Sequence, residues 1–177
     1  MRIVGGKWAG VSLVSPGTRV RPTREEVRDA WIAGLGADLA GARVLDLFSG
    51  TGALGLEALS RGAASVDFVE NGAPALHSLK ANLVKLGVKN RTRLFKKNAF
   101  LFLQAVENLT YDVALADPPY TSSAAERLVT LWLDRPFSRI LSIEHSSERS
   151  LPRQGKRRVY GDTAVTTYRS REKTPGP

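Results

Sequence analysis

The sequence has no cysteine among its 177 residues, which excludes disulfide bonds and thiolate metal sites. It has no apolar run close to the ~20 residues that a membrane-spanning helix needs. Its first ten residues, MRIVGGKWAG, lack the apolar stretch of a signal peptide. With 42% hydrophobic and 24% charged residues, the composition predicts a single globular domain, with no membrane partner, in the cytoplasm.

Acidic residues are also in the minority, with 17 Asp and Glu against 26 Lys and Arg and a formal net charge of +9. The basic excess gathers in residues 1–24, 91–97 and 153–158. Such clusters fit a polyanionic partner, because phosphate contacts give salt-sensitive affinity. We therefore expect a nucleic-acid partner, and the alternative is an ordinary solvated surface.

From residue 43 onward, apolar runs and helical patterns alternate, which indicates an α/β fold with a mostly parallel sheet covered on both faces. The expected strands are 43–47, 66–70, 91–95, 112–116, 139–144, 157–160 and 163–169. The expected helices are 53–61, 73–86, 98–108 and 123–133. Gly161-Asp162 is a two-residue turn signal, so the sheet should end antiparallel.

The N-terminal 36 residues are expected to form an appendage on a catalytic core of residues 37–170. Residues 2–14 predict a β-hairpin around a glycine-rich bend, and residues 15–22 a loop. Thr23 begins a helix with a capping box that Glu26 completes. The tail, residues 171–177, is expected to be disordered.

A glycine-rich turn follows the first strand of the core. Gly50, Gly52 and Gly55 have the G-x-G-x-x-G spacing that allows a tight bend, a close backbone approach to a ligand and close helix packing. Glu70 ends the next apolar run, where an acid can accept hydrogen bonds from a ribose diol. Asp46 lies before the turn, where a carboxylate suits a cationic ligand better than a dinucleotide pyrophosphate. Its alternative role is that of a helix-cap or turn partner. The pattern favours S-adenosylmethionine over NAD.

The tetrapeptide DPPY spans residues 117–120 at the end of another expected strand. Asp117 and the Pro118 carbonyl can accept hydrogen bonds from an exocyclic amine, which localises the nitrogen lone pair, and Tyr120 can stack on the base. The alternative is a rigid loop start at Pro118-Pro119. Because guanine presents N1–H beside its N2 amine, two adjacent donors, an acceptor-only carboxylate suits it better than adenine. We expect guanine N2 as the target.

These segments together resemble class I S-adenosylmethionine-dependent methyltransferases, and most closely the RsmD family, bacterial ribosomal small-subunit methyltransferase D. The resemblance rests on RIVGGKWAG, RPTREEVRDA, DLFSGTGALGLEALSRGA, Asn98-Ala99, DPPY and GDTAVTTYR, and covers nearly the whole chain. It implies a Rossmann-like fold with a seven-stranded, mostly parallel sheet, an antiparallel last strand, and an N-terminal β-hairpin and helix. It also implies methylation of one guanine N2 in 16S rRNA of the small ribosomal subunit or its assembly intermediate.

The resemblance assigns expected roles to individual residues. Base binding and catalysis are expected at Asp117, Pro118, Pro119 and Tyr120. Cofactor binding is expected at Asp46, Phe48, Ser49, Gly50, Gly52, Ala53, Gly55, Glu70, Asn71, Asn98 and Ala99. RNA contacts are expected at Arg2, Lys7, Arg19, Arg21, Thr23, Arg24 and Arg28. No metal is expected.

Three other functions remain open from the residues alone: methylation of DNA adenine or protein glutamine, hydride transfer with NAD, and RNA binding without catalysis. Asp117 disfavours the first, because a similar tetrapeptide there generally begins with Asn. Asp46 and DPPY disfavour the second, and the pairing of the two motifs disfavours the third. His77 is expected to be a surface or packing residue, and His145 at the site edge a poor general base. Nothing in the sequence argues against a monomer.

Overall fold

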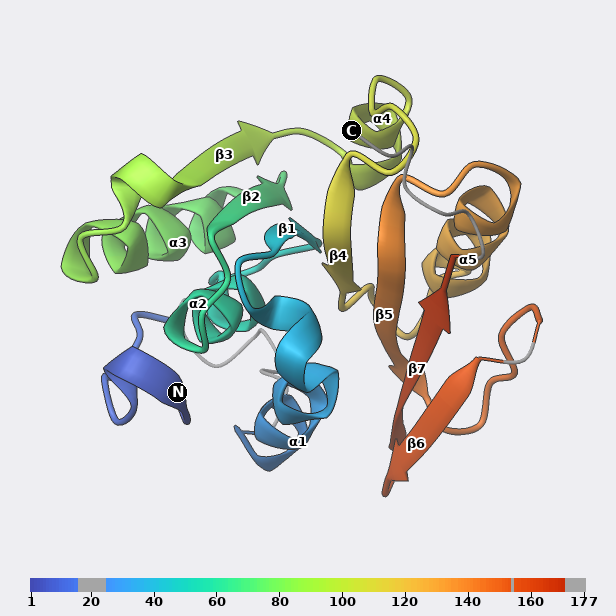
Figure 1. Cartoon of the computed structure of the whole chain (residues 1–177), viewed down its shortest axis with the longest axis horizontal. Helices are drawn as coiled ribbons and strands as arrows, with labels where there is room; N and C mark the ends of the chain where they lie inside the picture. The colour runs from blue at the N-terminus through green and yellow to red at the C-terminus, as the bar shows by residue number, and fades with distance from the viewer. Residues whose placement is uncertain (16–24, 154, 171–177) are drawn as a thin grey trace.

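The computed structural model describes residues 1–15, 25–153 and 155–170. A seven-stranded sheet forms its centre, in the order β3-β2-β1-β4-β5-β7-β6 (Figure 1). The strands are β1 (Arg43–Leu47), β2 (Ser65–Glu70), β3 (Thr92–Lys96), β4 (Tyr111–Ala116), β5 (Ser138–Ser146), β6 (Lys156–Tyr160) and β7 (Thr163–Arg169). Strands β1 to β5 are parallel, and β7 inserts antiparallel between β5 and β6. The predicted fold class is confirmed.

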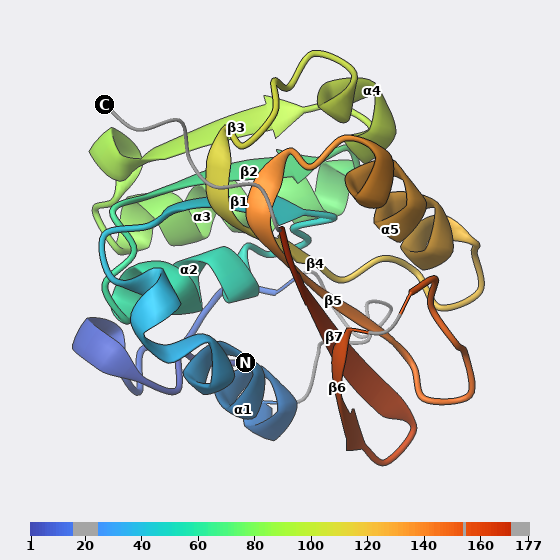
Figure 2. The same cartoon turned by 45° about the vertical axis from the view of Figure 1, so that its right-hand side comes forward.

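Helices cover both faces of the sheet (Figure 2). One face packs against α1 (Glu25–Leu35), α2 (Ala53–Ser60) and α3 (Ala73–Lys85), and the other against α4 (Ala99–Leu103) and α5 (Ala124–Asp134). Short 3-10 helices η1 (Gly6–Trp8), η2 (Gly36–Leu39) and η3 (Lys89–Arg91) complete the described elements. The two apolar cores lie between these helix layers and the sheet, so the strands of the centre are buried on both faces.

The expected N-terminal β-hairpin is wrong in detail. The chain does reverse direction, because Ile3 N donates to Val11 O at 2.9 Å, but only an isolated bridge joins Arg2 to Ser12. The 3-10 helix η1 occupies the bend in place of strand pairing. The predicted start of the first helix at Thr23, and the predicted disordered tail, lie outside the described residues.

The helix expected over residues 98–108 is shorter than predicted and ends at Leu103. The guanidinium of Arg135, which follows α5, donates hydrogen bonds to the carbonyls of Leu103, at 2.7 Å, and Val106. These carbonyls therefore bind a side chain that is distant in the sequence rather than a continuing helix.

Candidate functional site

The strand order reverses where β1 pairs with β2 on one side and β4 on the other, and open α/β sheets bind ligands at the carboxyl edge of such a point. Asp46 is completely buried near the end of β1, and its Oδ2 accepts a hydrogen bond from Gly55 N at 2.9 Å. Its Oδ1 has no hydrogen-bond partner among the described residues. Burial raises the pKa of this carboxyl to about 8, and the charges of Asp117 and Glu70 add to the rise. A buried carboxyl with an unsatisfied oxygen fits a cationic ligand group.

The turn after β1 is fixed by the neighbouring strand β2. Ser49 Oγ donates to the Asp46 carbonyl at 2.6 Å and accepts a hydrogen bond from Val69 N at 2.9 Å. Glu70 Oε2 accepts a hydrogen bond from Gly50 N at 2.8 Å. The acid expected to meet a ribose therefore also holds the first glycine of the turn, which brings two of the expected cofactor residues together.

The backbone of this turn explains two of its glycines. Gly50 has φ of +56° and Gly52 has φ of +80°, the left-handed region that side chains other than glycine rarely adopt. Gly52 caps α2, whose first residue is the half-buried Ala53. Phe48, at φ of +56°, adopts a similar conformation without being glycine, which is a strained geometry typical of functional loops.

Gly55→Ala should destabilise the protein by about 1–3 kcal/mol, because overpacking a filled core forces neighbouring atoms to move. A Cβ at Gly55 would lie 2.5 Å from Phe68 Cε1 and 2.8 Å from Val66 Cγ1, both on β2. Urea denaturation measures the change in the free energy of unfolding. The double variant Gly55→Ala/Phe68→Leu should recover part of the loss, and a single variant as stable as the parent protein would contradict the close packing.

The start of α4 lies beside this turn. Asn98 caps the helix, since its Oδ1 accepts hydrogen bonds from Phe100 N and Leu101 N at 2.9 and 3.3 Å. The ring of Phe100 contacts Phe48 edge to face, with centroids 6.1 Å apart, and the Arg127 guanidinium lies 4.3 Å from its centroid. Asn98 thus has a structural role that the sequence reading did not include.

Two further residues expected to bind the cofactor lie near these groups. Asn71 is exposed, and its N–H donates to Glu70 Oε1 at 2.9 Å. Ala99 is buried as the first residue of α4. The fold brings them to the same edge of the sheet as Asp46, and their cofactor contacts stay predictions.

The DPPY segment follows β4 at the same edge. Asp117 is half-buried, Pro118 is buried and Pro119 is exposed. The Pro119 carbonyl accepts hydrogen bonds from the N–H and hydroxyl of Ser122, whereas none of the described residues donates to the Pro118 carbonyl. Among the described residues, the Pro118 carbonyl, which is expected to bind an amine, is therefore available, whereas the Pro119 carbonyl is already hydrogen bonded to Ser122.

Tyr120 is held by two residues that the sequence reading missed. Its hydroxyl donates to the carboxylate of Glu144, at the end of β5, and hydrogen bonds to Thr163 Oγ1, at the start of β7, at 2.8 Å. Burial and the bond to Glu144 raise the pKa of the Tyr120 hydroxyl well above its usual range. The ring therefore stays neutral and fixed in orientation. Glu144 is an acid inside the apolar run ILSIEHS, and that unusual position could have marked it as a candidate site residue.

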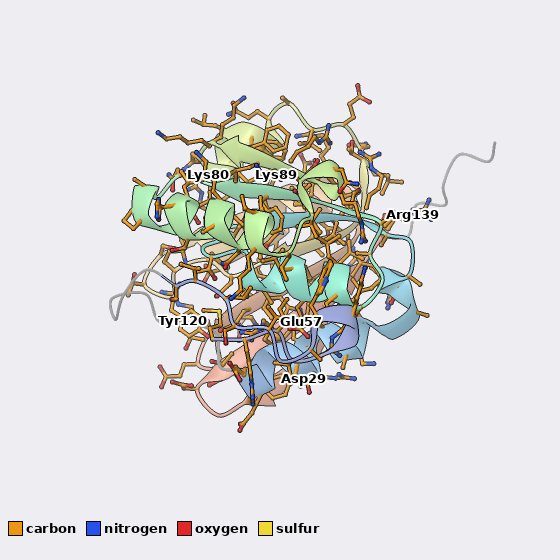
Figure 3. The ribbon with its side chains drawn as sticks, turned by 90° about the vertical axis from the view of Figure 1, so that its left-hand side faces the viewer. Asp29, Glu57, Lys80, Lys89, Tyr120 and Arg139 are labelled. Carbon is orange, nitrogen blue, oxygen red and sulfur yellow. The ribbon has the colours of Figure 1, made fainter. Side chains whose placement is uncertain are left out.

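Glu57, a fully buried acid on α2, is a third residue that the sequence reading missed. Its carboxylate accepts hydrogen bonds from the N–H groups of Val4 and Gly5 at 2.9 and 2.7 Å, and from Arg61 at 2.8 Å. Figure 3 labels Glu57, which lies between α2 and the N-terminal segment. Glu57 therefore anchors the first residues of the chain to the core.

The expectation that Arg28 contacts RNA is wrong for this structure. Its side chain is 1% exposed, its Nε lies 3.7 Å from Glu57 Oε2, and its Nη2 donates to the Arg2 carbonyl. Burial lowers the pKa of the guanidinium, and Glu57 opposes that shift. Arg28 neutralises Glu57 in the interior instead.

The other expected RNA contacts divide into two groups. Arg2 and Lys7 are exposed; Arg2 pairs with Glu25 at 3.0 Å, and the Lys7 ammonium lies 5.6 Å from the centroid of Trp8. Both are accessible to a large partner. Those that lie outside the described residues are Arg19, Arg21, Thr23 and Arg24.

Asn82 on α3 links the N-terminal segment to the glycine-rich turn. Its Oδ1 accepts a hydrogen bond from Val14 N at 2.7 Å, and its Nδ2 donates to the carbonyls of Val14 and Thr51, both at 3.0 Å. The side chain is completely buried. One amide thus connects three segments that are far apart in the sequence.

The two histidines differ in their surroundings. His145 is buried, with its ring nitrogens 2.9 Å from the Ser146 carbonyl and 2.8 Å from Thr166 Oγ1, and burial lowers its pKa. His77 is exposed on α3, as expected. Within residues 1–15, 25–153 and 155–170, no three His, Asp or Glu side chains gather in a way that could hold a metal ion.

Comparison with known proteins identifies the family. Residues 1–169 match the model of the family described as conserved hypothetical protein 95. The chain belongs to this family. Ribosomal RNA small subunit methyltransferase D of Escherichia coli K12 is 34% identical over 156 residues, which are 86% of this chain and 78% of that protein. The resemblance recognised in the sequence, to the small-subunit methyltransferase D family, is therefore confirmed.

Solved structures agree with this family assignment. A hypothetical protein from Thermus thermophilus superposes with a TM-score of 0.84 at 31% identity, covering 96% of this chain and 99% of that one. The Escherichia coli protein yhhF, described as a candidate methyltransferase, gives a TM-score of 0.81 at 32% identity, covering 96% and 97%. In this member of the family, no helix of the described part of the chain has the length and apolarity needed to cross a bilayer.

Proposed function

We propose that the protein is an S-adenosylmethionine-dependent methyltransferase that modifies the exocyclic N2 of a guanine in 16S rRNA. One observation carries the proposal: Asp117 and the Pro118 carbonyl, to which none of the described residues donates, lie beside the glycine-rich turn at the reversal of strand order. The names of the relatives support an rRNA substrate and a methyl-transfer reaction. We further propose that the enzyme acts in the cytoplasm, as a monomer, on the small subunit or its assembly intermediate.

The residues of the chain fit the cofactor. The buried Oδ1 of Asp46, which has no partner among the described residues, suits a cationic group, and Gly50 offers space, since a Cβ there would meet no atom of those residues within 4 Å. When bound, S-adenosylmethionine supplies an electrophilic methyl group. Asp46, Ser49 and Gly50 would hold its amino acid part, Glu70 and Asn71 its ribose, and Asn98 and Ala99 its adenine.

Catalysis by the protein rests on orienting one amine. The Asp117 carboxylate accepts hydrogen bonds from guanine N1–H and from one hydrogen of N2, and the Pro118 carbonyl accepts the other. The lone pair of N2 is then localised on nitrogen and directed at the methyl carbon. After transfer the nitrogen carries one proton in excess, and Asp117, already hydrogen bonded to it, is placed to accept that proton.

Tyr120 would provide the stacking face for the base. The target nucleotide must leave its stack to reach the edge of the sheet, at a cost of a few kcal/mol unless it lies in an open loop. A ring fixed by Glu144 and Thr163 replaces part of the lost stacking without having to be ordered at that moment.

Methyl transfer to isolated small subunits that lack this methyl group tests the proposal. Tritium from labelled S-adenosylmethionine should appear in N2-methylguanosine after nucleoside digestion. N6-methyladenosine as the product, or no transfer from a protein that binds neither the cofactor nor its demethylated product in calorimetry, would refute it.

Cofactor binding at pH 7 should release about one proton. The Asp46 carboxyl, with a pKa of about 8, is protonated in the empty site, and a cation nearby favours its ionised form. Calorimetry in two buffers with different protonation enthalpies measures the release. Asp46→Asn should abolish the buffer dependence, whereas equal heats for the parent protein in both buffers would contradict the role of Asp46.

A further inference from the structure

A hollow of about 380 Å³ lies between α1 and the β6–β7 hairpin, away from the residues assigned so far. Lys156, Arg158 and Tyr160 line it from β6, and Trp31 and Gly34 line it from α1. Alternate residues of a strand share one face, so these three β6 side chains form one row. Figure 2 shows the hairpin standing beside α1.

The row carries charge that no acid of the described residues neutralises. Lys156, Arg158 and the nearby Arg153 are exposed, and none has a carboxylate of residues 1–15, 25–153 or 155–170 within 4.0 Å. Arg169 also lines the hollow, but it forms an ion pair with Asp38 of η2. Unpaired cations in a row retain counterions that a polyanion can displace, which is the main source of affinity for nucleic acids.

The row leads to the base-binding segment. Tyr160 pairs with Thr163, whose hydroxyl contacts the Tyr120 hydroxyl at 2.8 Å. At a rise of about 3.3 Å per residue, Arg158 lies roughly 7 Å and Lys156 roughly 13 Å along β6 from Tyr160. These cations therefore approach the site over the length of a few nucleotides.

The site edge itself cannot attract a phosphate backbone. Asp46, Glu70, Asp117 and Glu144 all lie at or near the carboxyl ends of β1, β2, β4 and β5. The carboxylates of Glu70, Asp117 and Glu144 repel phosphates, whereas the protonated Asp46 adds no negative charge until a cationic cofactor binds. An RNA strand that delivers a base to this edge needs cations beside it, and β6 is the edge strand nearest to Tyr120 that provides a row of them.

We propose that this basic row, Lys156 and Arg158 with Arg153 at its beginning, binds the sugar–phosphate backbone of the RNA that carries the target base. The inference rests on the proposed function and extends it, because it names the surface that receives the substrate. Arg157 belongs to the other face of β6, where it donates a hydrogen bond to the Ser147 carbonyl at 2.6 Å. Because successive side chains of β6 point to opposite faces, Lys156 and Arg158 lie on the docking face, whereas Arg157 supports the loop that precedes the strand.

Arg158 also contacts α1, and the effect of that contact on stability differs from an effect on RNA binding. A Cβ at Gly34, in the last turn of α1, would lie 2.4 Å from Arg158 Nη1, so the guanidinium lies against that turn. Cations near a helix C-terminus stabilise the helix through its dipole. Loss of that contact would change the free energy of unfolding and leave the salt dependence of RNA binding unaltered.

The double variant Lys156→Ala/Arg158→Ala tests the proposal on small subunits. We expect KM for the subunit to rise about tenfold or more at moderate salt, with kcat changed less than about twofold. The slope of log(kcat/KM) against log salt concentration should become shallower by about 1 to 2, as expected for two lost phosphate contacts. Cofactor affinity should stay the same.

Lys80→Ala/Lys89→Ala is the matched control, because it removes the same charge at the opposite edge of the sheet. Both lysines are exposed, Lys80 on α3 and Lys89 on η3, and Figure 3 labels them. The control should keep the parent KM and salt slope. Equal KM and slope in both double variants, or a lowered stability with the parent slope, would overturn the docking surface.

Direct binding separates this inference from the proposed function. Salt-dependent sedimentation of the protein with small subunits reports docking without any methyl transfer. Binding that weakens only in Lys156→Ala/Arg158→Ala, with no N2-methylguanosine made by the parent protein, would refute the proposed reaction and support the docking surface. If the Lys156→Ala/Arg158→Ala variant binds small subunits as the parent does, and the parent makes N2-methylguanosine, the docking surface is refuted and the proposed reaction is supported.

Discussion

Asp117→Asn should lower the rate of guanine methylation by roughly 100-fold or more, with cofactor affinity almost unchanged. An asparagine amide turns a donor toward the N1–H and N2 donors of guanine, so the hydrogen bond that localises the lone pair is lost and the base is misplaced. Removing one oriented polar group from an active site typically costs 10²–10³ in kcat. Single-turnover transfer of tritiated methyl groups, with nucleoside analysis, measures the loss.

Asp112→Asn is the control for that experiment. Asp112 lies on the same strand, β4, at its opposite end, where it accepts a hydrogen bond from Arg43 N at 2.8 Å and faces Arg139 at 3.6 Å. The control should keep the parent rate, because its carboxylate is remote from the base-binding edge. A parent rate on guanine for Asp117→Asn would refute the role of the carboxylate in base selection.

Glu57→Gln should lower the free energy of unfolding by about 3–5 kcal/mol, the usual cost of removing one partner from a buried ion pair. The amide removes the carboxylate that lies 3.7 Å from the Arg28 guanidinium, which is only 1% exposed, and it can serve fewer of the N–H groups of Val4 and Gly5. The N-terminal segment should loosen at the same time. Urea denaturation followed by far-UV circular dichroism measures the change.

Asp29→Asn provides the comparison, because Asp29 pairs with the same Arg61 that contacts Glu57. Its side chain is 46% exposed, so the loss should stay below about 1 kcal/mol. If the two variants lose equal and small amounts, the buried network does not hold the N-terminal segment. Full methylation by folded Glu57→Gln protein would show that its role is limited to stability.

The core of the fold could be predicted because its signals are local. Strand β1 spans residues 43–47 in the prediction and in the structure, since apolar residues lie between a loop and a glycine-rich turn. The Gly161-Asp162 turn between β6 and β7 forms as expected, with antiparallel pairing on both sides of β7. Period and turn chemistry are enough for such elements.

The rest depended on contacts between distant residues. The N-terminal hairpin was expected from its glycines, but the N–H groups of Val4, Gly5 and Trp8 donate to Glu57 and Ser60 on α2 instead of to a second strand. Helix α4 ends at Leu103, whose carbonyl accepts a hydrogen bond from the Arg135 guanidinium. Neither partner is close in sequence, so no local pattern reports it.

The candidate site divides in the same way. The glycine-rich turn and DPPY lie at the same edge of the sheet, as predicted, and their ligand contacts stay predictions. The prediction for Arg28 was wrong because a basic residue on a helix was assumed to be exposed. Arg28, Trp31, Ile32 and Leu35 follow the spacing of one helix face, and all four are buried. That spacing, applied without regard to charge, would have placed Arg28 in the interior.

The amide of Asn82 restricts which sequences can carry this fold. It hydrogen bonds only to main-chain groups of Val14 and Thr51, so the contact makes no demand on the side chains at those two positions. Position 82 itself needs both a donor and an acceptor at that length, which only an asparagine side chain supplies. Across the family, we therefore expect varied side chains at positions 14 and 51 and asparagine alone at position 82, although all three positions meet at one place.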